Sequence, residues 1–332
     1  MKAIMIGNRN ARIDYVFSEE IMQQLREIVD IYPERITPDN LEQHKASLQD
    51  AEMAFSTWGM CRLDEDTIRT YLPKLKIIFY AAGSVKGFAE PFLKSGVKIT
   101  SAQSANAVPV AEYAAAQIIL ANKGFFQSAV KYKENFQAAK QYAHTFPGNF
   151  NTKVGIIGAG RIGRGVIERL SNCKLDIYVF DPFLPQETAE ALGVTKTSLE
   201  YIFEHCQTIS NHLANNPQTA GMLNGTLFDR MLPNATFINT GRGAQVVEAD
   251  LIKALKDEPA RTAVLDVTYP EPVEEDSELL SMPNVFITPH ISGSFNQEVI
   301  RMAEYIIDEL KRYINGEPLA YEIQLQDLET LG

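Results

Sequence analysis

The residues best suited to do chemistry in this sequence are an arginine, a glutamate and a histidine that each follow a predicted strand. Arg242 stands between two glycines in FINTGRG, Glu271 lies in YPEP, and His290 lies in ITPHIS. A guanidinium with glycines on both sides has room to bind a small carboxylate through two hydrogen bonds. A carboxylate beside an imidazole fixes its tautomer and favours its protonated form, so Glu271 and His290 together can supply a proton near neutral pH.

Each of these residues also has a structural interpretation. An arginine in a turn is more often solvated, and a histidine that follows a proline is more often structural. The chain has five histidines, however, and among the others His212, in TISNHL, also ends a predicted strand. His212 is therefore the alternative proton donor, whereas His44, His144 and His205 lie in helical or loop sequence without such a carboxylate partner.

The strongest local motif is a glycine-rich turn in KVGIIGAGRIG, residues 153–163. Gly158, Gly160 and Gly163 form GxGxxG directly after an apolar strand and directly before a helix. The first glycine permits the tight turn, the second lets a pyrophosphate approach the backbone, and the third lets helix and strand pack closely. Free amides at the positive end of the helix dipole then face the phosphates, and Arg161 can add a donor. The turn therefore predicts a dinucleotide site.

The acidic residue that accompanies such a turn is Asp181. It ends the next predicted strand, LDIYVFD, 18 residues after Gly163. A carboxylate at that place accepts hydrogen bonds from the adenosine ribose hydroxyls. It also repels a 2′-phosphate, and no arginine follows it directly, so the sequence favours NAD over NADP. The alternative is that Asp181 serves only as the first residue of an Asp-Pro turn.

Two series of strands and helices must position these residues. From residue 1 to about 101, short apolar runs alternate with amphipathic ones, which predicts βαβ units and a mostly parallel sheet. A second series follows the loop at 144–151, with strands at KVGIIG, LDIYVFD, TISNHL, ATFINTG, TAVLDVT and NVFITPH. Such near-continuous apolar strands indicate a sheet covered on both faces. We therefore expect an α/β fold with two doubly wound parallel-sheet domains, one flavodoxin-like and one Rossmann, with a cleft between them.

Two helices are expected to connect the domains. Residues 107–126 are rich in alanine and apolar on nearly every face, which predicts a helix buried on most sides. After His290 a long amphipathic sequence ends in Asn-Gly, a helix stop, and we expect this helix to pack on the first domain. The chain then crosses twice: residues 1–101, completed by 294–332, form a substrate domain, and residues 102–293 form an NAD-binding domain.

Composition limits the classes of partner. The chain has 332 residues, with 42 acidic against 31 basic side chains and a formal net charge of -11. That surplus, without any run of five Lys or Arg, repels nucleic-acid phosphates and anionic membranes. No stretch reaches the ~18 apolar residues that span a bilayer, and the N-terminus turns polar too soon for a signal peptide. Three separated cysteines without Cys/His ligand spacing predict reduced thiols, a cytoplasmic location and no metal site.

The ordered segments GAGRIG, FDP, NTGRG, LDV, PEP and TPHIS resemble the D-isomer-specific 2-hydroxyacid dehydrogenases, the family of phosphoglycerate, glycerate and formate dehydrogenases. The resemblance implies reversible hydride transfer between NAD and a 2-oxo acid, with Arg242, Glu271 and His290 as the catalytic residues. It also implies that His212 lies beside the cofactor, which removes it as the proton donor. The implied cofactor contacts are Gly158, Gly160, Arg161, Ile162, Gly163, Asp181, His212, Leu213, Thr240, Gly241 and Asp266.

The loop that should bind substrate departs from the family. Members usually read something like GxGVDNID there, whereas this chain has AAGSVKGF at residues 81–88. The resemblance still implies that the backbone amides of Gly83, Ser84 and Val85 bind a carboxylate together with Arg242, and Lys86 offers a cation for a phosphate or second carboxylate. Phosphoglycerate, glycerate or hydroxypyruvate, and a lactate-like acid therefore all stay open as substrates.

Two other functions stay open on the sequence. A non-catalytic NAD-sensing corepressor can use the same fold, but we expect it to carry long disordered, proline-rich or basic extensions, which this sequence lacks. A Rossmann methyltransferase would not require an arginine, a glutamate and a histidine after later strands. Formate dehydrogenases are less favoured, since that branch has glutamine in place of Glu271. By resemblance we also expect a homodimer, with the helix at 107–126 as a place for the subunits to meet.

Overall fold

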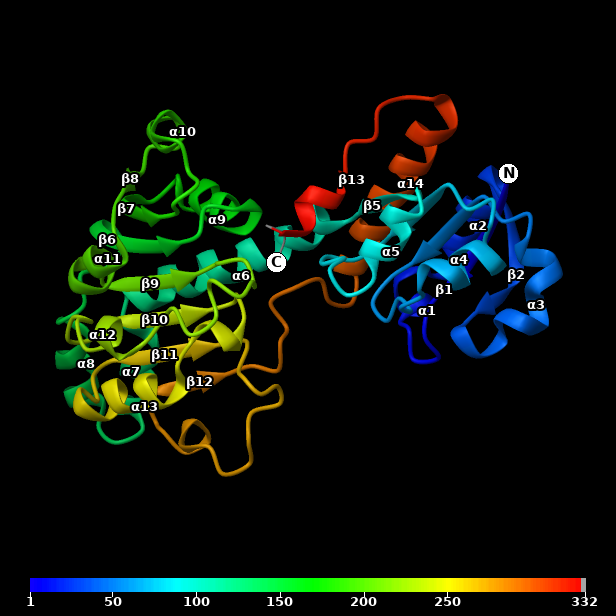
Figure 1. The fold of residues 1–332 in the computed structure, drawn as a ribbon. Coiled ribbons are helices and arrows are strands. Elements are labelled where there is room, and N and C mark those ends of the chain that lie inside the picture. The colour runs from blue at the N-terminus through cyan, green and yellow to red at the C-terminus, as the bar shows by residue number, and fades with distance from the viewer. Residues whose placement is uncertain (330–332) are drawn as a thin grey trace. The chain divides into compact units, whose positions relative to one another are not determined.

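The computed structural model describes residues 1–329, which form two compact α/β units. The first unit holds residues 1–107 together with the chain from residue 294 onward, and the second holds residues 108–293. The predicted division falls at residue 101, six residues before the observed one. Figure 1 shows each unit as a sheet with helices on its two faces.

The sheet of the first unit is doubly wound. Within the described residues it has six strands in the order β13-β5-β4-β3-β1-β2. Strands β1 to β5 pair in parallel in the flavodoxin-like order 2-1-3-4-5. The two-residue strand β13 adds an antiparallel edge that the sequence pattern does not predict.

The elements of the first unit have the following bounds. The strands are β1 Lys2–Ile6, β2 Asp30–Ile36, β3 Met53–Ser56, β4 Ile77–Tyr80, β5 Lys98–Ser101 and β13 Glu322–Ile323. The helices are α1 Ile13–Val16, α2 Glu19–Ile28, α3 Leu41–Leu48, α4 Glu65–Tyr71, α5 Ala89–Lys94 and α14 Glu298–Asn315.

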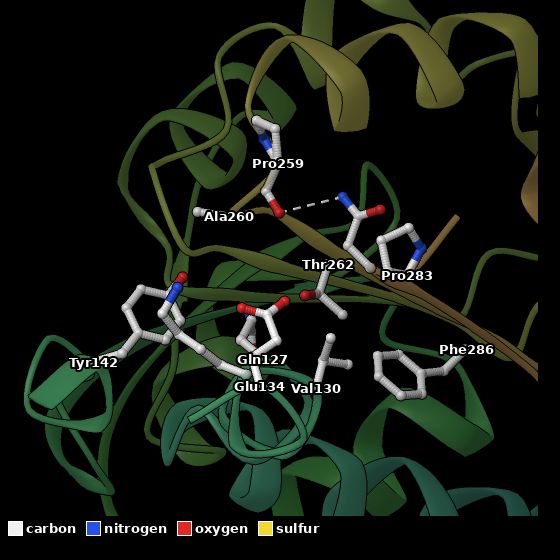
Figure 2. Close-up of a pocket in the computed structure, with 11 residues that line it drawn as sticks. Gln127, Val130, Glu134, Tyr142, Pro259, Ala260, Thr262, Pro283 and Phe286 are labelled. Atoms are coloured by element: carbon white, nitrogen blue, oxygen red, sulfur yellow. Dashed lines mark hydrogen bonds between the residues drawn. The ribbon is translucent and has the colours of Figure 1, made fainter. Parts of the chain in front are cut away.

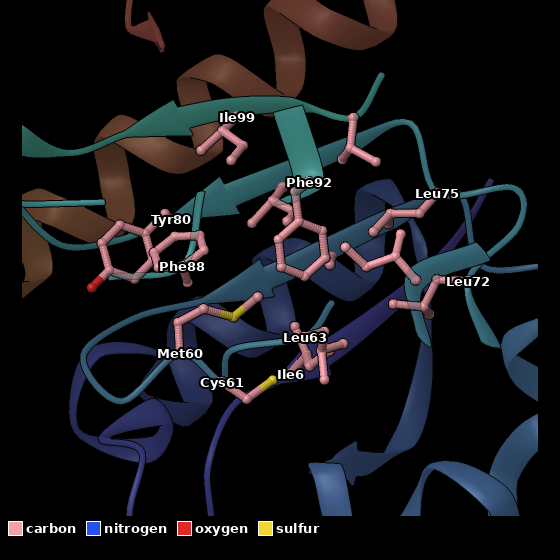
Figure 3. Close-up of a cluster of buried hydrophobic side chains, with 14 of the residues drawn as sticks. Ile6, Met60, Cys61, Leu63, Leu72, Leu75, Tyr80, Phe88, Phe92 and Ile99 are labelled. Carbon is pink, nitrogen blue, oxygen red and sulfur yellow. The ribbon is translucent and has the colours of Figure 1, made fainter. Parts of the chain in front are cut away.

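Alternation along the strands divides the core of the first unit between the two faces of its sheet. In β4, Ile78 packs into one apolar cluster, which Figure 3 shows around Phe92, whereas Phe79 packs into the other. The second cluster contains Ile306 and other apolar side chains of α14, so this helix packs on the first sheet. The helix ends at Gly316, whose left-handed φ of 70° caps it as the Asn-Gly signal predicts.

The sheet of the second unit is the Rossmann sheet. Over the part of the chain that the structure describes, it has seven strands in the order β12-β11-β10-β9-β6-β7-β8, all parallel. Figure 1 shows α11, α12 and α13 on one face and α6, α7 and α8 on the other. The predicted doubly wound α/β fold is therefore confirmed in both units.

The elements of the second unit have the following bounds. The strands are β6 Phe150–Ile157, β7 Lys174–Phe180, β8 Thr195–Lys196, β9 Thr208–Asn211, β10 Thr236–Asn239, β11 Thr262–Leu265 and β12 Val285–Ile287. The helices are α7 Phe125–Tyr132, α8 Phe136–Ala143, α9 Arg161–Leu170, α10 Gln186–Ala191, α11 Leu199–His205, α12 Gly225–Phe228 and α13 Glu248–Asp257.

The alanine-rich helix differs from its prediction in its bounds. It is α6, Gln103–Asn122, which begins in the first unit and continues in the second. It ends before residue 126 because Gly124 takes a left-handed φ of 65° and caps the start of α7. Its buried residues Ala114 and Ile118 belong to the apolar cluster against the second sheet, so that face of α6 is used within its own chain.

No helix in residues 1–329 is both long enough and apolar enough to cross a membrane.

We predict that Phe79→Ala lowers the free energy of unfolding of the first unit by about 3–5 kcal/mol, the usual cost of an emptied aromatic site. Phe79 is fully buried, stacks on Phe55 with ring centroids 5.2 Å apart, and meets Tyr313 of α14 at 6.0 Å. Urea denaturation followed by the fluorescence of Trp58, the single tryptophan and a residue of this unit, measures the loss.

The control is Ile314→Ala on α14, since Ile314 is 38% exposed. This variant should stay within about 1 kcal/mol of the wild type. Equal losses for the two variants would contradict the proposed packing.

Candidate active site

The predicted site residues of the second unit follow the carboxyl ends of its parallel strands. The glycine turn follows β6, Asp181 follows β7, Arg242 follows β10, and His290 follows β12. Strands β7 and β8 continue the sheet on one side of β6, and strands β10, β11 and β12 continue it on the other side of β9. The boundary between β6 and β9 is therefore a topological switch point. Ligands of open α/β sheets bind outside the carboxyl ends of the strands at such a point.

The glycine turn leaves space at the start of α9. A Cβ at Gly163 would lie 2.0 Å from the carbonyl oxygen of Gly158, so only glycine allows this approach of helix and strand. Gly160 caps α9, and a Cβ built there would meet no atom within 4 Å. The first amides of a helix have no partner within the helix and carry its positive dipole end. The turn therefore has the space and the donors that a phosphate needs, and phosphate binding there stays a prediction.

Asp181 contacts the glycine turn and its own turn at once. One carboxylate oxygen accepts a hydrogen bond from the amide of Ala159 at 2.8 Å, and the other accepts from the amide of Phe183 at 2.8 Å. The bond to Phe183 closes the Asp-Pro turn, which is the purely structural role that the sequence also allowed for Asp181. The bond to Ala159 holds the carboxylate beside the glycine turn, where a ribose contact stays a prediction.

His212 is held between two hydroxyls in the interior of the second unit. Its Nε2 lies 2.9 Å from Oγ of Ser210, and its Nδ1 lies 3.2 Å from Oγ1 of Thr240. Burial lowers the pKa of His212 to about 3. A histidine with that pKa is neutral at neutral pH, which makes it unsuited to donate a proton there.

Glu271 and His290 form a hydrogen-bonded pair next to Arg242. Nδ1 of His290 lies 2.7 Å from a carboxylate oxygen of Glu271, and both side chains are about two-fifths exposed, at 42% and 43%. Burial lowers the pKa of the Arg242 guanidinium, while the negative charge of Glu271 acts in the opposite direction. Glu271 therefore interacts with both of the other predicted catalytic residues, and Nε2 is the imidazole nitrogen that Glu271 does not use.

The turn that carries Arg242 packs directly on the segment that leads to Glu271. A Cβ at Gly243 would lie 1.9 Å from the carbonyl carbon of Thr268, so any other residue would push these two backbones apart. The guanidinium of Arg242 also donates to the carbonyl oxygen of Gly241 at 2.7 Å. The glycines of NTGRG thus give close packing on one side of the arginine and a carbonyl acceptor on the other.

The loop that carries His290 is held by the buried carboxylate of Asp266. This carboxylate accepts hydrogen bonds from the hydroxyl of Thr288 at 2.6 Å and from the amides of Ile291 and Ser292 at 2.8 and 2.9 Å. His290 itself has a left-handed φ of 55°. That conformation costs about 1–2 kcal/mol, whereas a hydrogen bond to a charged group contributes about 1.5–3 kcal/mol. The bonds to Asp266 therefore outweigh the backbone strain.

The sequence pattern misses two residues that support this loop, Thr288 within it and Tyr113 on α6. Thr288 lies 3.0 Å from the hydroxyl of Tyr113 on α6, so the helix braces the loop through a second hydroxyl. Thr288 stands two residues before His290 in TPHIS, and this closeness in sequence is what could have indicated its role. Tyr113 is 175 residues away in sequence and gave none.

The predicted substrate loop, residues 83–85, belongs to the first unit and follows β4. The hydroxyl of Ser101 donates to the carbonyl oxygens of Ala82 at 3.0 Å and Gly83 at 2.7 Å. Among residues 1–329, no acceptor takes a hydrogen bond from the amides of Gly83, Ser84 or Val85. Gly83 and Ser84 are half-buried and Val85 is fully buried, and the binding of an anion by these amides stays a prediction.

A cavity of about 360 Å³ lies at the other edge of the second sheet, and Figure 2 shows its lining. Thr262 is the first residue of β11, and Phe286 lies in β12 just after its start. Gln127 of α7 and Tyr142 of α8 complete this wall of the cavity. None of the predicted site residues lines the cavity, so we do not assign the predicted chemistry to it.

Two of the three thiols are unsuited to nucleophilic catalysis. Burial raises the pKa of Cys61 to about 11 and that of Cys206 to about 12, so both are protonated at neutral pH. Within the described residues, no group of three or more His, Cys, Asp and Glu side chains could hold a metal ion.

Residues 115–292, more than half of the chain, match the model of the NAD-binding domain of D-isomer-specific 2-hydroxyacid dehydrogenases. The chain belongs to this family. The resemblance drawn from GAGRIG to TPHIS is therefore confirmed, as is NAD as the cofactor. The match covers the glycine turn, Asp181, Arg242, Glu271 and His290.

Curated relatives of the chain include D-3-phosphoglycerate dehydrogenases. That of Synechocystis is 27% identical over 256 residues, which are 77% of this chain and 46% of the relative. That of Bacillus subtilis is 27% identical over 297 residues, 87% of this chain and 56% of the relative. The chain thus spans about half the length of the curated relatives it matches.

Solved structures share the fold of the chain. A phosphoglycerate oxidoreductase from Rhizobium etli has a TM-score of 0.79 at 22% identity, with 97% of each chain covered. A D-lactate dehydrogenase with NAD+ from Lactobacillus jensenii has a TM-score of 0.76 at 19% identity, with 98% of this chain and 100% of the other covered.

We predict that His212 makes the second unit less stable in mild acid. Its unfolded form binds a proton below about pH 6.5 and its folded form only below about pH 3, so stability is lost as the pH falls between these values. From about pH 7.5 to about pH 5.5 the wild type should lose about 1.4 kcal/mol more than His212→Gln. Urea denaturation at both pH values, followed by circular dichroism, measures the difference. Equal pH dependence in the two proteins would contradict the buried neutral imidazole.

Proposed function

We propose that this chain is an NAD-dependent oxidoreductase that interconverts a small D-2-hydroxy acid and its 2-oxo acid. The observation that carries the proposal is the 2.7 Å contact between Glu271 and Nδ1 of His290, next to Arg242, at the carboxyl edge of the NAD-binding domain. Relatives named D-3-phosphoglycerate dehydrogenase support this reaction class. Phosphoglycerate, glycerate or hydroxypyruvate, and a lactate-like acid remain the candidate substrates.

The residues around the glycine turn fit NAD. The space above Gly160 and the amides at the start of α9 suit a pyrophosphate, and the Asp181 carboxylate beside the turn suits ribose hydroxyls. When bound, NAD accepts the hydride from the hydroxy acid or its reduced form supplies it to the oxo acid. The other residues proposed to line its site are Arg161, Ile162, His212, Leu213, Thr240, Gly241 and Asp266.

Arg242 is proposed to bind the substrate carboxylate and to polarise the carbonyl that is reduced. Its guanidinium is largely buried, which strengthens an interaction with a carboxylate relative to the same contact in water. Its two hydrogen-bonding edges allow a bidentate contact. The amides of Gly83, Ser84 and Val85 are proposed to donate to a substrate carboxylate.

His290 is proposed to hold the exchanged proton at Nε2. In the direction of reduction the imidazolium donates this proton to the oxygen that becomes the hydroxyl, and in oxidation the neutral imidazole accepts it. Glu271, bound to Nδ1, stabilises the positively charged ring and keeps Nε2 aimed away from the carboxylate. Asp266 holds the loop in which His290 lies.

His290→Ala should lower kcat for 2-oxo acid reduction by about 10²–10⁴-fold, the usual contribution of a general acid. NADH binding should stay within about threefold, because the substitution removes only the proton donor. The assay is NADH oxidation with phosphohydroxypyruvate, hydroxypyruvate and pyruvate, and NADH binding is measured by fluorescence titration. His144→Ala is the control, since His144 is exposed and caps the end of α8.

Turnover at the wild-type rate in His290→Ala would contradict the assignment. A non-catalytic NAD sensor would behave differently again: the wild type would bind NADH and oxidise it with none of the three acids.

A homodimer and a cytoplasmic location stay predictions. The helix at 107–126 stays the place where the subunits are expected to meet: one of its faces packs on its own sheet, and Leu120, on α6, is 38% exposed.

A further inference from the structure

Three amide side chains are buried at the carboxyl ends of β9 and β10. Asn211 and Gln245 are fully buried and Asn239 is 1% exposed. The amide nitrogen of Asn211 donates to Oδ1 of Asn239 at 2.9 Å and to Oε1 of Gln245 at 2.7 Å. We name these three residues the amide cluster.

The amide cluster binds the backbone of the turn that carries Arg242. Oε1 of Gln245 accepts from the amide of Arg242 at 3.0 Å, and Oδ1 of Asn239 accepts from the amide of Gly241 at 3.0 Å. The amide nitrogen of Asn239 donates to the carbonyl oxygen of Arg242 at 3.2 Å. Both backbone polar groups of the arginine are therefore held by buried side chains.

The same cluster binds the loop that follows β9. Nε2 of Gln245 donates to the carbonyl oxygens of Leu213 at 2.9 Å and Ala214 at 3.1 Å, and Oδ1 of Asn211 accepts from the amide of Leu213 at 3.2 Å. Gln245 thus uses both lone pairs of its oxygen and both hydrogens of its nitrogen. A rotation of this side chain would break bonds to both loops at once.

We propose that the amide cluster is a positioning device for Arg242, which fixes the arginine turn to the loop at residues 213–214 and so sets where the guanidinium meets the substrate carboxylate. This inference rests on the proposed function of Arg242. Apolar side chains could fill the same interior space without the cost of burying amides. Apolar side chains could not, however, form hydrogen bonds with the backbone amide and carbonyl of Arg242, as the amide cluster does.

A purely structural role would predict something different. Buried amides that only stabilise the fold would affect the free energy of unfolding and leave the substrate affinity of the folded protein unchanged. Asn122, the last residue of α6, is such an amide: it is fully buried, and its oxygen accepts from the hydroxyl of Thr208, the first residue of β9, at 2.6 Å. It lies near the start of β9, whereas Asn211 is the last residue of that strand.

The test compares Gln245→Met, Asn211→Leu and their double variant with the control Asn122→Leu. Methionine keeps the length of glutamine and removes all four hydrogen bonds. We expect Gln245→Met to raise KM for the 2-oxo acid by about tenfold or more, with NADH binding within about threefold. The double variant should lose no more in kcat/KM than the worse single variant, because the two residues act as one unit.

Hydrogen exchange gives a readout that does not depend on activity. Gln245→Met should speed exchange of the amide of Arg242 by about tenfold or more, since this amide loses its acceptor, whereas the amide of Gly241 keeps its acceptor on Asn239. Asn122→Leu should lower stability while leaving both KM and these two exchange rates at wild-type values.

The outcomes separate this inference from the proposed function. A wild type that reduces no 2-oxo acid contradicts the proposed function, and exchange at Arg242 still decides whether the cluster holds the turn. A Gln245→Met variant with wild-type exchange at Arg242 and with KM within about twofold of the wild type overturns the inference.

Discussion

The hydrogen bond between the Glu271 carboxylate and Nδ1 of His290 is the interaction on which the chemistry proposed for this protein depends. A histidine with a free Nδ1 could present either nitrogen, in either tautomer, to a substrate. The 2.7 Å contact commits Nδ1 to the carboxylate and leaves Nε2 for the proton transfer that we propose. The negative charge of Glu271 also acts on the neighbouring Arg242, so one carboxylate influences both other members of the site.

The constraint that makes this contact possible is the anchoring of loops by buried polar groups. Strands β10, β11 and β12 bring their carboxyl ends to one edge of the sheet. Arg242, Glu271 and His290, however, lie in the loops that follow these strands. Asp266 holds the loop of His290 by two backbone amides, and Gln245 holds the turn of Arg242 by one. Because buried hydrogen bonds are costly to break, these loops gain the rigidity that a loop on a protein surface usually lacks.

Much of the fold and the candidate site could be predicted from local sequence. Apolar runs marked the central strands, and GxGxxG marked the start of α9 at Arg161. Arg242, Glu271 and His290 stood out because ionisable residues followed such runs, next to glycine or proline. Edge elements were harder to predict: β2 carries Pro33 and β8 has two residues, so neither has a clear alternating pattern.

The contacts that position the site could not be predicted from local sequence, since they join residues far apart in the chain. Asn211 and Gln245 are 34 residues apart, and each alone reads as a polar residue near a strand end. Asp266 was expected only as a cofactor contact, while in the structure it binds the His290 loop 25 residues later. Such pairs depend on strand order, which no pattern within one segment contains.

The most direct measurement of the central claim is the turnover of Glu271→Gln in NADH-dependent reduction of the preferred 2-oxo acid. Glutamine keeps the size of the side chain and an oxygen for Nδ1 of His290, but it removes the charge that stabilises the imidazolium. The account predicts a fall in kcat of about 100-fold with unchanged NADH affinity. A kcat within about twofold of the wild type would show that the carboxylate does not support His290, and would contradict the account.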